Sequence, residues 1–290
     1  MMTASLILVS MIGTFQNLMV IAALLFSRNN LLQIPSNWFV LSLATADFLV
    51  CGVSVPLYIA HLHVFIWQHF LAFGHFTTII SAGSLFLLTF NRFLSIYDTL
   101  SYMKRMTVFR AKSLAMGMWC AAISLAIINT VTKNYVEKVA VFLSIAYYLM
   151  INILTAGFHV YMFRISWNKT KAIRGQRLAV MSGQQKNVMQ EYNHLLRLAI
   201  IAGTYVITWV PFILTLSATP DDEERRSRTF QRKFALFYTL LSINSAIDPF
   251  LYFLRSEEFK KATKKILRIR SRTQNRVRPQ MNAFHINRAF

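Results

Sequence analysis

Two carboxylic acids lie within long apolar runs of this 290-residue chain, where an ionised group is costly. Asp47 is the only charged residue in the range 29–91, and Asp248 is the only one in 234–254. An acid at membrane depth needs polar partners inside the protein, which makes it a candidate for function. The polar residues at similar depths in the apolar runs are Asn17, Ser81, Asn244 and Ser245.

Three roles are open to this group of side chains. Its carboxylate, hydroxyl and amide oxygens are ligands that suit a hard cation such as sodium. The two acids could instead take up protons, or the whole group could be a polar network that only holds helices together. Pro249 directly follows Asp248 and removes a backbone hydrogen bond, so the carbonyl that it frees needs a polar neighbour.

The segments that carry these residues are long and apolar. Hydrophobic residues make up 55% of the chain and charged residues only 14%, against about 25% in soluble proteins. A membrane helix needs about 20 apolar residues, and the range 29–91 is long enough for two crossings. The other runs of this kind are 1–27, 113–132, 139–163, 198–220 and 234–254. We therefore predict seven spans, with a very short outer loop at about 131–138 between the fourth and the fifth.

The fold class predicted is an all-α membrane protein, a seven-transmembrane helix bundle. Only helices and closed barrels satisfy the backbone in lipid, and barrel strands would alternate in polarity. We expect the first run to be the first span rather than a cleaved signal peptide, because it contains no basic segment and is too long.

The placement of charge predicts the orientation. With the N-terminus outside, the outer loops hold only seven of the 31 lysine and arginine residues, as the positive-inside rule requires. We expect a multi-pass protein of the plasma membrane with its C-terminus in the cytoplasm. The net charge of +20 then predicts contact with membrane lipid or an acidic cytoplasmic partner, and no nucleic acid.

The segment "RSEEFKKATKKILRIR" follows the last span. It places apolar residues on one helical face and basic residues on the other, which predicts a short amphipathic eighth helix at the membrane surface. Residues 1–267 would form the transmembrane domain with this helix. Residues 268–290 are polar and basic, and we expect a disordered cytoplasmic tail.

Seven short motifs occur in order, one on each span. They are "FQNLMVI", "LSLATADFLV", "NRF" at 91–93, Trp119, Tyr161, "TWVP" at 208–211 and "DPFLY" at 248–252. On these motifs the chain resembles the rhodopsin-like (class A) G-protein-coupled receptors over residues 4–267. The resemblance implies a receptor that is not an enzyme and needs no organic cofactor. It agrees with the chain, in which we find no nucleophile–base set and no metal-ligand cluster.

The resemblance implies a sodium pocket around the two acids. The residues that it assigns to this pocket are Asp47, Ser81, Asn244, Ser245 and Asp248. An allosteric sodium ion would be held at Asp47, Ser81 and Asp248.

The resemblance also implies a switch at the cytoplasmic face. Arg92 would pair with Glu191 at rest, and movement of span six would open a cleft for a heterotrimeric G protein. Tyr161 and Tyr252 would then turn in toward Arg92. The residues assigned to the switch and to G-protein coupling are Asn91, Arg92, Tyr161, Glu191, Trp209, Pro211, Pro249 and Tyr252.

Asn91 departs from the family pattern, which has an aspartate before the arginine. An asparagine can form a hydrogen bond but carries no charge, so we predict weaker restraint of Arg92 and some signalling without ligand.

For the ligand, two classes are disfavoured. Gly74 stands where amine receptors have an aspartate, and Ser242 stands where opsins have the retinal lysine. The remaining pocket is weakly polar and aromatic, which favours an uncharged or lipophilic ligand. Its residues are His75, Thr78, Asn129, Phe212, Ile213, Thr215 and Ser242. The family's extracellular disulfide and its span-five proline have no counterparts in this chain. In these two departures the chain resembles the melanocortin receptors and their adenosine and cannabinoid relatives.

Two other functions stay open on the sequence. A receptor-like protein that does not couple could act by pairing with another receptor, which fits Asn91 and the missing disulfide. A transporter could use Asp47 and Asp248 to move sodium or protons, but we find no trace of the inverted repeats that are typical of transporters.

Overall fold

The computed structural model describes residues 2–26, 30–61, 67–177, 208–209, 211–212, 214–215 and 227–253. All regular structure in these ranges is helical, which confirms the all-α fold class. The elements are α1 (Met2–Phe26), the 3₁₀ turn η1 (Leu31–Gln33), α2 (Ser36–Leu49), the π-helical turn η2 (Val50–Ser54), α3 (Val55–His61), α4 (Trp67–Tyr97), α5 (Thr99–Arg105), α6 (Val108–Arg177) and α9 (Arg228–Phe253).

Five helical stretches are long and apolar enough to cross a membrane, and they coincide with the first five predicted spans. They are Thr3–Phe26, Ser36–His61, Phe73–Tyr97, Val108–Ile128 and Ile145–Ile165. The seventh predicted span lies in α9, whose 26 residues correspond to about 39 Å of helix. The sixth is described only at 208–209, 211–212 and 214–215, where it is helical. The predicted eighth helix and the tail lie outside the described residues.

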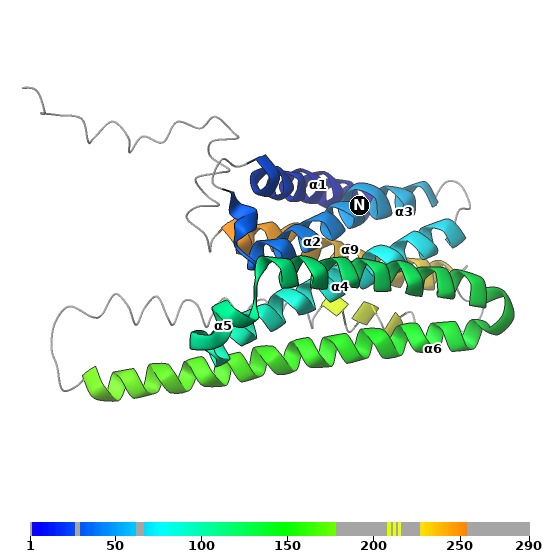
Figure 1. Cartoon of the computed structure of the whole chain (residues 1–290). Coiled ribbons are helices and arrows are strands. Elements are labelled where there is room, and N and C mark those ends of the chain that lie inside the picture. The colour runs from blue at the N-terminus through cyan, green and yellow to red at the C-terminus, as the bar shows by residue number, and fades with distance from the viewer. Residues whose placement is uncertain are drawn as a thin grey trace, which may run out of the picture.

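The fourth and fifth spans are the two arms of α6, which folds back on itself (Figure 1). The chain reverses direction between the two arms, in the region of the expected outer loop at 131–138, although the backbone of these residues is helical. The reason is local: "VTKNYVEK" contains neither glycine nor proline to stop a helix.

Helix α4 lies at the centre of the bundle, in contact with α2, α3, α5 and α6, while α1 packs against α2 and α9. The close approach of α4 to the first arm of α6 depends on a glycine. A Cβ atom at Gly83 would lie 2.3 Å from Met118 Sδ, well inside van der Waals contact. The second span has an irregularity of its own, the π turn η2, which ends two residues before Pro56. Proline lacks an N–H group and clashes with the carbonyl four residues before it, here within η2, so it disturbs the helix at this turn.

Candidate functional site

The two intramembrane acids meet in the middle of the bundle, as the sequence predicts. Ser81 Oγ on α4 donates a hydrogen bond to Asp47 Oδ1 on α2, at 2.9 Å. The Ser245 and Asp248 side chains of α9 lie beside the same carboxyl group. Asp47 is 0% exposed and Asp248 is 4% exposed. Three spans therefore contribute to one buried acidic site.

Asn17 connects this site to the first span. Its Nδ2 donates to Gly13 O at 2.9 Å and to Ser245 O at 3.0 Å. Ser245 is four residues before Pro249, so its carbonyl is the one that loses a helical N–H partner to the proline. The expectation that this freed carbonyl finds a polar side chain is confirmed, and the partner is Asn17.

The oxygen atoms of the site suit a small hard cation. Within the described residues, Asp47 Oδ2 and Asn17 Oδ1 are buried and accept no hydrogen bond. Two carboxyl groups and a hydroxyl lie around them, and oxygen is the donor that such cations prefer. Asn244 is half-buried one helical turn before Asp248, and in the described structure it forms no hydrogen bond with either acid.

The other end of α4 carries the "NRF" motif and meets the short helix α5. Tyr102 of α5 donates a hydrogen bond from its hydroxyl to Asn91 Oδ1, at 3.0 Å. Asn91 is buried, so this bond satisfies the amide oxygen that replaces the usual carboxylate. Sequence reasoning did not single out Tyr102, although its position eleven residues after Asn91 is what a short connecting helix would bring back to the motif.

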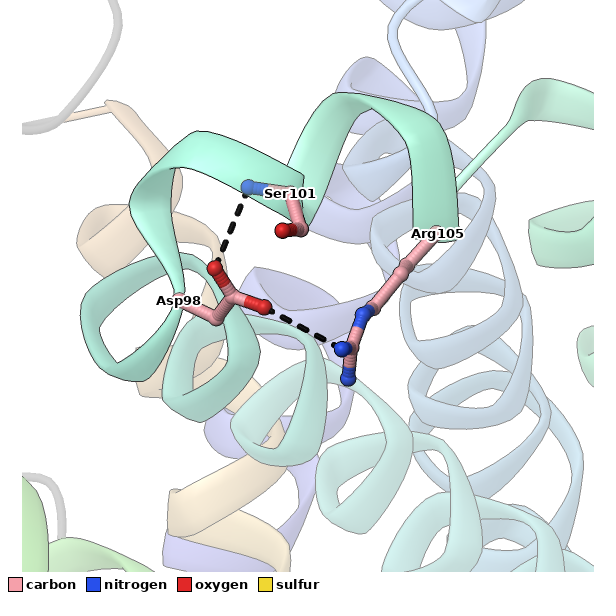
Figure 2. Close-up of polar contacts among 3 residues, drawn as sticks. All are labelled: Asp98, Ser101 and Arg105. Carbon is pink, nitrogen blue, oxygen red and sulfur yellow. Dashed lines mark hydrogen bonds and ion pairs between the residues drawn. The ribbon is translucent and has the colours of Figure 1, made fainter.

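Asp98 fixes the start of α5 (Figure 2). Its Oδ1 accepts a hydrogen bond from the Ser101 backbone N–H at 3.1 Å, which caps the helix. Its Oδ2 lies 3.4 Å from Arg105 Nη2, but Arg105 is 63% exposed, so this ion pair contributes little. This cap stabilises the start of α5, the helix that carries Tyr102.

The remaining switch residues lie on separate spans. Arg92 is half-buried on α4. Trp209 is buried, with its ring 5.6 Å from that of Tyr148. Tyr161 does not point into the bundle: it is 43% exposed. Pro211 is half-buried and Pro249 lies inside α9, whereas Glu191 and the Tyr252 side chain lie outside the described residues.

The predicted ligand pocket is less polar than its sequence indicates. The hydroxyls of Thr78, Thr215 and Ser242 each donate to a carbonyl of their own helix, one turn back. Phe212 packs against the rings of Phe234 and Tyr238. Ile213 and the Asn129 side chain lie outside the described residues.

Two tyrosines at this end of the bundle were not predicted. Tyr148 places its hydroxyl 3.4 Å from His75 Nδ1 and its ring against Trp209, so it joins spans three, five and six. Tyr238 forms a hydrogen bond with Ser54 at 2.9 Å, within a buried cluster of rings that includes Tyr58. The only signal in the sequence is the high aromatic content of 14%.

Comparison with known proteins agrees with this architecture. A family model described as "7 transmembrane receptor (rhodopsin family)" matches residues 16–252. Melanocortin receptor 5 from Ovis aries is 28% identical over 89% of this chain and 81% of the relative. The Homo sapiens receptor is 26% identical over 88% and 81%, and the Sus scrofa receptor 27% over 86% of both chains.

These matches confirm the class A resemblance, the likeness to the melanocortin group and the seven-span fold. They also confirm that the protein is a membrane receptor rather than an enzyme. The chain belongs to the rhodopsin family of seven-transmembrane receptors.

Proposed function

We propose that this receptor passes an extracellular ligand signal to a cytoplasmic heterotrimeric G protein through movement of span six. The observation that carries the proposal is the arrangement at the α5 end of α4. There Arg92 follows an asparagine that is held by Tyr102, a residue of the connecting helix, rather than by a charge. An asparagine carries no charge, so it lacks the Coulomb attraction that an aspartate would exert on the neighbouring arginine. Arg92 is therefore restrained less than in a receptor with an aspartate.

The acidic site supports the same function, because it couples the motif to the bundle interior. Arg92 lies on α4, the helix whose Ser81 donates to Asp47, and Asp248 lies beside Asp47. A change in the charge of the acid pair therefore changes the attraction on Arg92.

We further propose that Asp47, Ser81 and Asp248 hold a sodium ion, with Ser245 beside them. The support is the fit of the donors: two buried carboxyl groups, a hydroxyl, and an Asp47 oxygen that accepts no hydrogen bond among the described residues. A bound cation would supply positive charge that offsets the repulsion of the two acids. Asn244, being only half-buried, is the least supported member of the predicted set.

The proposed location is the plasma membrane, with the N-terminus outside and the C-terminus in the cytoplasm. The exposed basic residues near α5, among them Lys104, Arg105 and Arg110, then face the cytoplasm. They suit lipid headgroups or an acidic G-protein surface. For the ligand, the self-satisfied hydroxyls of the pocket favour an uncharged, lipophilic molecule over a polar one.

The test is G-protein activation without ligand, across the main G-protein classes, in cells with matched surface levels of each variant. The wild type is expected to give a basal signal that Arg92→Ala abolishes and Asn91→Asp lowers. Tyr102→Phe removes the hydrogen bond that the Asn91 side chain accepts within the described residues, and it is expected to raise the signal. An Asn91→Asp variant with unchanged or higher basal activity would contradict the restraint argument.

A receptor-like subunit that pairs with another receptor without coupling is the second candidate, and the uncharged Asn91 is the observation that favours it. Silence of every variant in every G-protein class, with co-purification of a partner receptor, would support this alternative. Transport of sodium or protons through Asp47 and Asp248 is a third candidate. Uptake of radioactive sodium by proteoliposomes that contain the receptor would support it.

A further inference from the structure

A column of aromatic rings joins α4 to the second arm of α6. Phe158 of the second arm contacts three rings of α4, with centroid distances of 5.9 Å to Phe86, 5.7 Å to Phe90 and 4.8 Å to Phe93. The three α4 residues follow one another at helical spacings of four and three, so their rings lie on one face. Packed aromatic rings therefore form part of the contact between spans three and five.

Phe93 is the centre of this column. Its ring contacts those of Phe90, Tyr97 and Phe158, and it also meets Tyr161 at 5.5 Å with an interplanar angle of 64°. Tyr97 adds a second contact to Tyr161, at 6.4 Å. An edge-on approach near 5.5 Å is one of the favoured geometries of aromatic pairs.

Tyr161 is held at the border between the bundle and the lipid. On the second arm of α6, Thr155, His159 and Met162 are at most 5% exposed and mark the inner face. Successive residues of an α-helix are roughly 100° apart, so Tyr161 lies one such step away from Met162. Its exposed fraction of 43% agrees with this position. To reach the interior, the ring must leave Phe93 and Tyr97.

We propose that Phe93 is a positioning residue that keeps Tyr161 on the outer side of the contact between spans three and five. Phe93 is the neighbour of Arg92, so the ring that Tyr161 must leave is next to the arginine that it would approach. The third residue of the "NRF" motif is thus a second restraint, apolar and independent of the bond between Asn91 and Tyr102. This inference rests on the proposed function only for its consequence in signalling. The position of Tyr161 is a separate observable.

The first experiment measures that position directly. 3-Fluorotyrosine is placed at residue 161, and fluorine NMR spectra are recorded for the full-length receptor in phosphatidylcholine nanodiscs. We expect one dominant resonance for the parent and a second resonance for Phe93→Leu. The population ratio of the inner to the outer ring position should shift about two- to tenfold, which corresponds to the energy of one aromatic contact. Phe86→Leu is the matched control: it removes a ring of the same column that contacts Phe158 but not Tyr161 in the described structure, and its spectrum is expected to match the parent.

A second variant covers the case in which Phe93→Leu does not fold. Tyr97 is 61% exposed, so Tyr97→Leu is tolerated more easily and is expected to shift the ratio in the same direction by a smaller factor. A parent spectrum that neither Phe93→Leu nor Tyr97→Leu changes would overturn the inference.

The second experiment separates the inference from the proposed function. Basal G-protein activation of Phe93→Leu is expected to rise about two- to tenfold, and Tyr161→Phe in the same chain is expected to remove the rise. A shifted resonance without any G-protein signal from any variant would leave the inference intact and contradict the proposed function. A rise that persists with Tyr161→Phe would overturn the inference, because Phe93 would then act by another route.

Discussion

The hydrogen bond between Asn17 and the Ser245 carbonyl leads to a prediction about stability. The prediction holds only if Asn17 replaces the helical N–H group that Pro249 lacks. Asn17→Ala removes the donor, and the Ser245 carbonyl then keeps no partner, because Pro249 has no N–H to return to it. In a chain with Pro249→Ala, residue 249 regains an N–H and can form the ordinary helical bond to Ser245. Asn17→Ala should therefore cost less stability in the Pro249→Ala background than in the wild type.

The size of the difference follows from the burial of the site. Asn17 is 0% exposed, so the carbonyl left behind is cut off from water. A buried unpaired polar group costs about 1–3 kcal/mol, although hydrogen bonds inside membranes average nearer 0.6 kcal/mol. We expect a coupling of about 1 kcal/mol between the two substitutions. For a chain of this size that corresponds to about 2–4 °C in the midpoint of thermal unfolding.

The assay is thermal unfolding of the purified receptor in nanodiscs, for the wild type, the two single variants and the double variant. Asn152→Ala is the matched control, because Asn152 Nδ2 donates only to Tyr148 O within its own helix. It is expected to change the midpoint by less than Asn17→Ala does. Equal losses from Asn17→Ala in both backgrounds would refute the argument that the asparagine serves the carbonyl freed by the proline.

Two further predictions concern packing and the acid pair. Gly83→Ala would bring a Cβ to within 2.9 Å of three Met118 atoms, so it should lower the unfolding midpoint. Met118→Ala in the same chain should restore most of this loss. A midpoint unchanged by Gly83→Ala would show that Met118 moves aside freely. Sodium chloride should raise the unfolding midpoint above that in choline chloride at the same ionic strength. At ten times Kd, a bound sodium ion adds about 1.4 kcal/mol to the free energy of unfolding. Asp47→Asn should remove this difference, and a difference that survives the substitution would place the ion elsewhere.

The meeting of Asp47 and Asp248 could be predicted from the sequence, because an ionisable side chain within a membrane span must face the protein interior. Burial of Asp47 and Asp248 away from lipid is enforced by the cost of exposing them, so two acids at similar depths must meet inside the bundle. The partner of the carbonyl freed by Pro249 is constrained in the same way, and Asn17 is the polar residue that the first span offers at that depth. Each of these predictions uses the shortage of polar partners in an apolar segment.

The orientation of Tyr161 could not be obtained by that reasoning. In a soluble helix, the apolar side faces inward, but in a membrane both sides are apolar, so hydropathy does not define the rotation of a span. Leu154 and Tyr161 are exposed on the second arm of α6, while Met162 is fully buried, although all three are hydrophobic. What sets the rotation is the fit of Phe158 against the rings of α4, a long-range contact between residues some 65–72 positions apart in the chain. The same limit applies to Ser242, whose hydroxyl donates to the Tyr238 carbonyl of its own helix. The sequence shows that a hydroxyl is present but does not show which acceptor it binds.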